Sequence, residues 1–256
     1  MRPSHLILIA AALLLAAPVG IDAQRGGGGG RAQGAPPTPK SDAAIDITGT
    51  WTAVISEDWA LRMVTPKKGD YTRVPMTPAA RKIADSWDPA RDEAAGEQCK
   101  SYGAPALMSV PGRLHITWQD DNTLKVETDA GRQVRTFHFA QGAAAGGEAS
   151  RQGYSVANWE MVAGGDEGKA RWGTLRVVTR GLKPGYLRRN GVPYSENTVV
   201  TEYYDLLPPL PNRDPWFTVT TIVNDPKYLT QEFITSTDFK QERDGSKWSP
   251  SPCEAS

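Results

Sequence analysis

Residues 113–139 read RLHITWQDDNTLKVETDAGRQVRTFHF and contain three segments in which apolar and polar residues alternate. Such alternation places every second side chain on the same face of a strand. The polar turn at residues 120–122 separates the first two segments, and Ala130-Gly131 separates the second from the third. Short turns of this kind join neighbouring antiparallel strands. The stretch therefore predicts a three-stranded meander.

The same alternation recurs on both sides of the meander. It predicts further strands over residues 48–55, 154–161, 172–180, 198–206, 216–224 and 232–241. Clusters of Gly, Asn, Asp and Pro separate these segments. About nine closely connected antiparallel strands without strand–helix–strand units predict a mainly β domain. Two architectures satisfy this pattern: a closed antiparallel meander barrel and, as the alternative, a two-sheet β-sandwich.

One helical region interrupts the predicted strands. Thr77 is suited to cap a helix that begins at Pro78, and apolar residues at helical spacing continue this helix to about Trp87. A second short helix is predicted after Pro89. We expect the acidic residues of this region to form a solvated face; they are Asp85, Asp88, Asp92, Glu93 and Glu97.

The N-terminal residues have the pattern of an export signal. Arg2 precedes an apolar stretch at residues 6–16, and the small residue Ala23 follows it. This pattern predicts a signal peptide over residues 1–23, cleaved after Ala23, because the apolar stretch is shorter than the ~20 residues of a spanning helix. Residues 24–47 are rich in Gly and Pro and predict a flexible linker. The folded domain is then expected over residues 48–256, in a periplasmic or secreted protein.

The cysteine content agrees with export. Cys99 and Cys253 are the only two cysteines. An even pair in a chain sent to an oxidising compartment predicts a disulfide, here closing a loop of about 155 residues. Two sulfurs without a nearby His or a third Cys are poor ligands for zinc. The sequence therefore predicts a structural disulfide and no metal site.

The overall charge excludes one large class of function. The chain has 29 Lys and Arg against 29 Asp and Glu, so its net charge is zero. A protein that binds nucleic acid through the phosphates needs a basic field, and none is available here. No segment after the N-terminal stretch reaches transmembrane length, and no phosphate-binding loop or metalloprotease motif is present. We therefore expect a small-molecule ligand and no cofactor, nucleic acid or integral membrane span.

Three residues are candidates for proton transfer. His115 and His138 lie in the predicted meander, and Glu202 lies beside Tyr203 in a later strand. An imidazole or a buried carboxylate near a tyrosine hydroxyl can act as a general acid or base. Surface histidines and a solvent-facing glutamate remain the alternative interpretation of the same pattern.

Candidate ligand-binding residues come from charge and aromatic content. Residues 171–189 hold six basic side chains and no acidic one: Arg171, Arg176, Arg180, Lys183, Arg188 and Arg189. Arg176 and Arg180 are spaced for one strand face, where an anionic small molecule or an acidic partner can dock. Trp118 and Tyr203 are candidates to line the mouth of a pocket. The alternative is a basic sheet face that offsets the acidic helices.

Two resemblances add to this interpretation. The opening Gly49-Thr50-Trp51 resembles the first strand of the calycins, the lipocalin-like superfamily, which implies that Trp51 closes one barrel end against a cation from Lys240 or Arg243. Residues 182–195, LKPGYLRRNGVPYS, and the following TEYY at residues 201–204 resemble a family of secreted bacterial proteins described as hypothetical. That second resemblance implies export and carries no activity.

Two functions from different classes follow. The first is an exported small-molecule-binding protein whose lipocalin-like barrel takes an apolar or aromatic ligand, with an acidic group met by the Arg-rich strand. The second is a cofactor-free exported lyase, isomerase or hydrolase that uses a His or Glu in the barrel mouth. The direction in which His115, His138 and Glu202 point discriminates between them, because a catalytic group must face a cavity that water can enter.

Overall fold

The fold is described from a computed structural model. The chain divides after Pro36, and the fold below is that of Pro37–Ser256. The structure describes residues 36–139, 148–161, 172–208, 211 and 213–255. The predicted signal peptide and the first part of the predicted linker lie outside the described residues. No helix among the described residues is long and apolar enough to cross a membrane.

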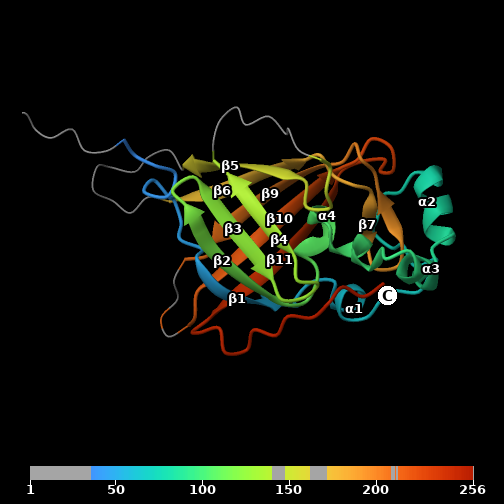
Figure 1. Ribbon diagram of the computed structural model, residues 1–256, viewed down its shortest axis with the longest axis horizontal. Helices are drawn as coiled ribbons and strands as arrows, with labels where there is room; N and C mark the ends of the chain where they lie inside the picture. The colour runs from blue at the N-terminus through green and yellow to red at the C-terminus, as the bar shows by residue number, and fades with distance from the viewer. Residues whose placement is uncertain (1–35, 140–147, 162–171, 209–210, 212, 256) are drawn as a thin grey trace, which may run out of the picture. The chain divides into compact units, whose positions relative to one another are not determined.

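Nine strands close into a barrel (Figure 1). They are β1 (Gly49–Val54), β2 (Arg113–Asp120), β3 (Thr123–Thr128), β4 (Val134–His138), β5 (Tyr154–Met161), β6 (Gly173–Arg180), β9 (Val199–Leu206), β10 (Trp216–Asn224) and β11 (Phe233–Glu242). Their order around the barrel is β1-β11-β10-β9-β6-β5-β4-β3-β2. The mainly β prediction and the barrel are confirmed, and the architecture is consistent with a calycin-like barrel.

One strand pair departs from the expected antiparallel meander. β4 and β5 are parallel, and only two residue pairs join them: Phe137 with Ser155 and His138 with Val156. A parallel pair requires the chain to cross from the end of one strand to the start of the next, which takes a long connection. β4 ends at His138 and β5 begins at Tyr154, so the chain between them is long enough for this. The barrel is therefore mixed, with a short seam between β4 and β5.

Short helices and a hairpin lie beyond one end of the barrel (Figure 1). They are α1 (Trp59–Met63), α2 (Pro78–Asp85), α3 (Pro89–Ala94), the 3₁₀ helix η1 (Gln98–Tyr102), α4 (Ala104–Leu107) and the hairpin of β7 (Gly185–Arg188) with β8 (Val192–Tyr194). α2 begins as predicted, because the Thr77 hydroxyl accepts a hydrogen bond from the Ala80 amide at 3.2 Å. The sequence predicts two helices here, and the others are too short for periodicity to reveal.

The sequence predicts that the acidic residues of the helical region form a solvated face. The structure differs from this prediction at one residue. Asp92 is buried, and its carboxylate accepts hydrogen bonds from Lys100 Nζ at 2.5 Å and from the Tyr186 hydroxyl at 2.7 Å. The prediction is wrong for Asp92 because the fold brings it two partners. Lys100 lies nearby in sequence, on η1, whereas Tyr186 lies on the distant strand β7. A buried charge is tolerated where it is paired in this way.

The sequence predicts that the folded domain begins at Thr48. In the structure it begins earlier. Ile45 and Ile47 belong to the buried core of the barrel. The Trp159 indole donates a hydrogen bond to the Pro39 carbonyl at 2.8 Å, and the Lys40 amide donates to the Asp121 carbonyl at 3.1 Å. The described end of the predicted linker, from Pro37, therefore packs on the barrel. Composition alone does not show this, because it does not indicate which surface the apolar residues contact.

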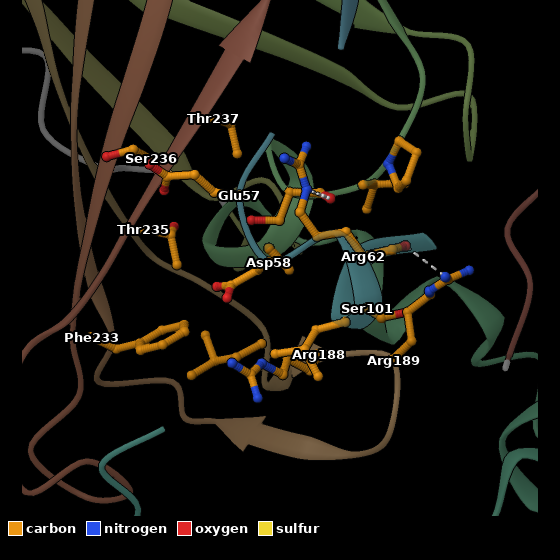
Figure 2. Close-up of a pocket in the computed structure, with 16 residues that line it drawn as sticks. Glu57, Asp58, Arg62, Ser101, Arg188, Arg189, Phe233, Thr235, Ser236 and Thr237 are labelled. Carbon is orange, nitrogen blue, oxygen red and sulfur yellow. Dashed lines mark hydrogen bonds between the residues drawn. The ribbon is translucent and has the colours of Figure 1, made fainter. Parts of the chain in front are cut away.

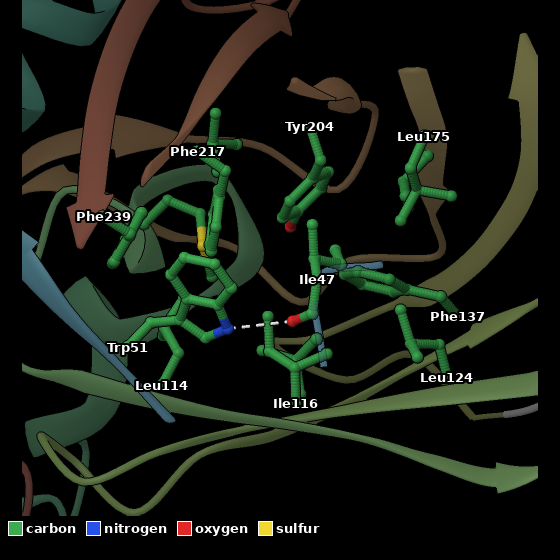
Figure 3. Packing of buried hydrophobic residues seen from close by; sticks show 14 of the residues in the cluster. Ile47, Trp51, Leu114, Ile116, Leu124, Phe137, Leu175, Tyr204, Phe217 and Phe239 are labelled. Atoms are coloured by element: carbon green, nitrogen blue, oxygen red, sulfur yellow. Dashed lines mark hydrogen bonds between the residues drawn. The ribbon is translucent and has the colours of Figure 1, made fainter. Parts of the chain in front are cut away.

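Aromatic side chains fill the barrel lumen (Figure 3). Trp51 packs edge-on against Phe217 with ring centroids 4.6 Å apart, and Phe217 stacks on Phe239 at 5.0 Å. Phe137 and Tyr204 continue the cluster, and none of these five residues is more than 1% exposed. A barrel of about eight strands is just wide enough for side chains to fill. The lumen is therefore filled by side chains over this length, and no ligand space remains among these residues.

The first-strand tryptophan is buried as the calycin resemblance implies, but its polar partner differs. The Trp51 indole donates to the Ile47 carbonyl at 2.9 Å (Figure 3). Lys240 forms an ion pair with Asp214 at 3.0 Å, and Arg243 is exposed beyond the end of β11. No cation–π contact with Trp51 is formed within the described part of the chain. The implied cation is wrong because Lys240 is paired with Asp214 and the Trp51 ring packs against Phe217 instead.

The predicted disulfide between Cys99 and Cys253 is confirmed, with a sequence separation of 154. It joins η1 to the C-terminal segment. The same segment is held by the Ser251 amide, which donates to the Asp129 carbonyl at 2.9 Å. The disulfide thus fixes the end of the chain against the helical end of the barrel.

Buried tyrosines make the fold sensitive to alkaline pH. Burial raises the pKa of Tyr194 to about 12. Burial, together with the charge of Glu202, raises the pKa of Tyr204 well above its ordinary value. In the unfolded chain both phenols ionise near pH 10, so the unfolded state loses protons first as the pH rises. The contribution of these tyrosines to the free energy of unfolding is therefore fully present below about pH 10 and is lost progressively as the pH rises above it.

We expect the free energy of unfolding to fall steadily between about pH 10 and pH 12. Denaturant titrations at each pH, with tyrosinate absorbance followed in parallel, measure this. Tyr194→Phe is the control, since it removes one titrating group and makes the dependence shallower. Tyrosinate absorbance that develops fully near pH 10 in the folded protein contradicts the assignment.

Candidate functional site

A cavity of about 60 Å³ lies at the helical end of the barrel (Figure 2). Its walls come from α1, from the start of β11, from the segment around α4 and from the turn of the β7–β8 hairpin. The strand β11 contributes the hydroxyl-bearing residues Thr235, Ser236 and Thr237, and apolar side chains from three elements complete the wall: Leu61, Leu187 and Phe233. The cavity therefore combines polar and apolar surface in a small space.

Arg62 is the unusual residue of this cavity. Only 8% of its surface is exposed, and its side chain extends from α1 toward Thr237 (Figure 2). Nε donates to the Ser109 carbonyl at 2.9 Å. Nη1 and Nη2 are buried and have no hydrogen-bond partner among the described residues. A guanidinium keeps its proton in proteins, so these two nitrogens are charged donors without acceptors.

Burial is energetically unfavourable for this group. Burial lowers the pKa of Arg62, and the charges of Asp238, Asp58 and Glu57 oppose that change without forming an ion pair with it. A buried donor without an acceptor costs about 1–3 kcal/mol, and more when it is charged. The site therefore holds a desolvated positive charge whose remaining donors have no acceptor among the described residues.

The hairpin holds α1 in place. Arg189 Nη2 donates to the Arg62 carbonyl at 2.9 Å (Figure 2). Asn190 Nδ2 donates to the carbonyls of Lys67 at 3.2 Å and Asp70 at 2.9 Å. These bonds join residues more than one hundred positions apart. The β7–β8 turn thus positions the segment that carries Arg62.

The other charges at the cavity differ in how far they are paired. Asp58 forms an ion pair with Arg73. Arg188 donates to the Thr72 carbonyl at 2.7 Å and lies over the Phe233 ring at 5.8 Å. The exposed Glu57 has no hydrogen bond or ion pair within the described part of the chain. Among the described residues that line this cavity, Glu57 is thus an acidic side chain without a partner, and Arg62 is the arginine whose two terminal nitrogens have no acceptor.

Glu202 lies in the barrel interior and not at its mouth, where the enzyme hypothesis places an acid or base. Arg135 donates to both of its carboxylate oxygens, at 2.9 and 2.6 Å, and both side chains are fully buried. Thr179 accepts from Arg135 at 3.2 Å and shares a 2.8 Å hydrogen bond with Ser155. The Tyr204 hydroxyl completes the network at 3.4 Å from Glu202. The carboxylate is therefore enclosed by protein partners.

The two histidines face away from the lumen. His115 lies 3.5 Å from Glu127, and nearly half of its side chain is exposed. His138 stacks on Tyr154 with ring centroids 4.8 Å apart, and its Nε2 lies 3.1 Å from the Thr136 hydroxyl. The strand β3 separates them, as predicted. Neither lines the Arg62 cavity.

The four predicted ligand-binding residues do not form one site. Trp118 contacts Phe139 at 5.4 Å in the partly buried shell of the barrel core. Arg176 and Tyr203 are neighbours on the outer face of β6 and β9, and Arg180 is exposed. They face outward because the alternate residues of β6 fill the lumen. Arg171 lies outside the described residues, whereas Arg188 and Arg189 do line the cavity.

The sequence contains only a weak signal for the residues that it missed. Arg62 and Glu57 lie in a segment without strand or helix periodicity long enough to interpret. The hydroxyl run at residues 235–237 interrupts the apolar alternation of β11, which is the one local sign of an unusual environment. The pairing of α1 with the distant hairpin is what brings these residues together.

The fold and site define a closed nine-stranded mixed barrel with a small charged cavity at one end. Comparison with protein-family models, curated proteins and solved structures gave no match. Among the described residues, no group of three or more His, Cys, Asp or Glu side chains is placed to hold a metal ion. The function is therefore argued from the site itself.

Proposed function

We propose that the protein binds a small organic anion in the Arg62 cavity. The observation that carries this proposal is the pair of buried, unpartnered guanidinium nitrogens of Arg62. A carboxylate accepts two parallel hydrogen bonds from a guanidinium, and such charge-assisted bonds are roughly twice as strong as neutral ones. Binding an anion thus offsets the free-energy cost of burying this charge.

The size of the cavity supports a small ligand. A single water occupies at least about 10–15 Å³ by this kind of measure, so about 60 Å³ holds a few atoms of that size. The lumen is filled by aromatic side chains, so the proposed ligand site is at the barrel end and not inside the barrel. This placement favours a compact anion over a large apolar ligand.

The placement of the titratable groups favours binding over proton-transfer catalysis. Glu202 is enclosed by Arg135, and the two histidines lie away from the cavity. A general acid or base must come within hydrogen-bond reach of the proton it moves. We therefore place binding first and an acid–base enzyme second.

We also infer that the protein acts outside the cytoplasm. The residues that support this are the basic start, the apolar stretch at residues 6–16 and the small Ala23, which together match a cleavable signal peptide. The Cys99–Cys253 disulfide agrees with an oxidising compartment. A periplasmic or secreted location is thus the proposal that agrees with both the N-terminal signal pattern and the disulfide.

Arg62→Met tests the binding proposal. Met keeps an apolar stem but removes the guanidinium, so we expect the affinity for acetate, propionate or inorganic phosphate to fall about 10–100-fold, as for loss of a hydrogen bond to a charged group. Titration calorimetry or ligand-observed NMR measures this. Arg243→Gln is the matched control, because Arg243 is exposed and does not line the cavity.

The free Arg62→Met protein should unfold at the same temperature as the wild type or higher, because the unpaired charge is gone. Failure of all three anions to bind the wild type, or equal binding to wild type and variant, overturns the proposal.

A further inference from the structure

We propose that the ligand is a zwitterion, a small α-amino acid, whose carboxylate is held by Arg62 and whose ammonium group is held by Glu57. This inference rests on the proposed function. It adds a second charged contact in the same cavity, from a residue that the anion proposal does not use.

The first step is the state of the acidic residues at the cavity. Glu57 and Asp58 both line it. Asp58 is neutralised by Arg73, whereas Glu57 has neither a hydrogen bond nor an ion pair among the residues that the structure describes. One acidic side chain is therefore available to a positively charged group of the ligand.

The second step is the relation of Glu57 to Arg62. The two residues are five positions apart and line one cavity, yet they do not form an ion pair with each other. The guanidinium is buried and Glu57 is exposed. Opposite charges that line one small space without contact suit a molecule with two charges of its own. The buried end requires a negative group, and the exposed rim requires a positive group.

The third step is the effect of Glu57 on a ligand without a positive charge. A simple carboxylate bound at Arg62 places its charge near Glu57, and like charges repel in a partly desolvated site. An ammonium group on the adjacent carbon turns this repulsion into attraction. The cavity thus discriminates against simple carboxylates as well as attracting zwitterions.

The remaining walls limit the size of the side chain. Leu61, Leu187 and Phe233 supply apolar surface, and Thr235 and Ser236 supply hydroxyls. With about 60 Å³ available, the side chain is small, as in alanine or serine, and not aromatic. This assigns the ligand to the class of small neutral amino acids.

The test compares L-alanine with propionate, which has the same carbon chain but no ammonium group, on the wild-type protein by titration calorimetry. We expect L-alanine to bind about tenfold more tightly, the effect of one hydrogen-bonded charge contact. Glu57→Gln should reduce this ratio to about one while propionate binding is kept or strengthened. Glu93→Gln makes the same charge change at an exposed site on α3 and should leave the ratio unchanged.

The outcomes separate the two proposals. If L-alanine and propionate bind equally well, or if Glu57→Gln leaves the ratio unchanged, the zwitterion inference is overturned and the anion proposal stands. If neither binds and phosphate does not bind either, both proposals fail. Binding of L-alanine that survives Arg62→Met also overturns the assignment of its carboxylate.

Discussion

Replacing Glu202 with Gln is expected to lower the free energy of unfolding by about 3–5 kcal/mol, the cost of leaving a buried charge without its partner. Arg135 and Glu202 are both fully buried, and two hydrogen bonds join them. Although burial alone lowers the pKa of Arg135, the Glu202 carboxylate raises it above its ordinary value. A guanidinium keeps its proton in proteins, so Arg135 stays charged in the variant even though its partner there is neutral. Denaturant unfolding followed by circular dichroism measures the loss.

Two further variants make this result specific. Glu196→Gln breaks the exposed pair with Lys227 and should leave the stability nearly unchanged, because solvent screens this pair. The double replacement Arg135→Met with Glu202→Leu removes both charges and should recover most of the stability lost in the single variant. A loss below about 1 kcal/mol in Glu202→Gln contradicts the assignment of a desolvated pair.

The network around this pair also crosses the weakest part of the barrel. Arg135 lies on β4, Ser155 on β5, Thr179 on β6 and Glu202 on β9. The backbone pairing of β4 with β5 involves only two residue pairs. The side-chain hydrogen bonds therefore join the strands on both sides of this seam. We expect the Glu202→Gln variant to show faster amide exchange in β4 and β5 than in β10 and β11.

Replacing both cysteines with Ser is expected to cost about 2–5 kcal/mol. The upper value is the chain-entropy cost for a long loop, and this bond closes one with a sequence separation of 154. The melting temperature should fall by about 5–15 °C for a domain of this size. The C-terminal segment keeps some contacts without the bond, since the Glu254 amide donates to the Tyr102 hydroxyl at 3.3 Å.

Thermal unfolding of the wild type and of the Cys99→Ser/Cys253→Ser variant, each with and without reductant, gives the comparison. Reductant should lower the melting temperature of the wild type toward that of the variant and leave the variant unchanged. Equal melting temperatures in oxidised wild type and variant refute a stabilising role for the bond.

Local pattern predicted much of the secondary structure. The strands expected at residues 154–161 and 216–224 coincide with β5 and β10, because alternation over eight or nine residues is a strong signal. The helix after Thr77 begins at the predicted residue because its cap and first-turn proline act locally. By contrast, α1 and α4 have four or five residues, too few for a period to be recognised.

The candidate site was predicted only in part. The basic run contains Arg188 and Arg189, which line the cavity, and also Arg176 and Arg180, which lie on the outer barrel face. Arg62 gave no signal, because an isolated arginine in sequence does not reveal whether acceptors surround it in the fold. Its lack of partners follows from contacts among α1, β11 and the β7–β8 hairpin.

The sequence by itself determined the strands, the capped helix and the disulfide, because alternation, capping and the presence of just two cysteines are local or compositional properties. Only the tertiary structure decided that aromatic residues fill the lumen, that β4 and β5 run parallel, that Glu202 serves an ion pair and that Arg62 is left unpaired. Alternation defines two faces of a strand but does not say what meets each face. The free energy of a buried charge depends on which side chains contact it, and those side chains come from segments that are distant in the sequence.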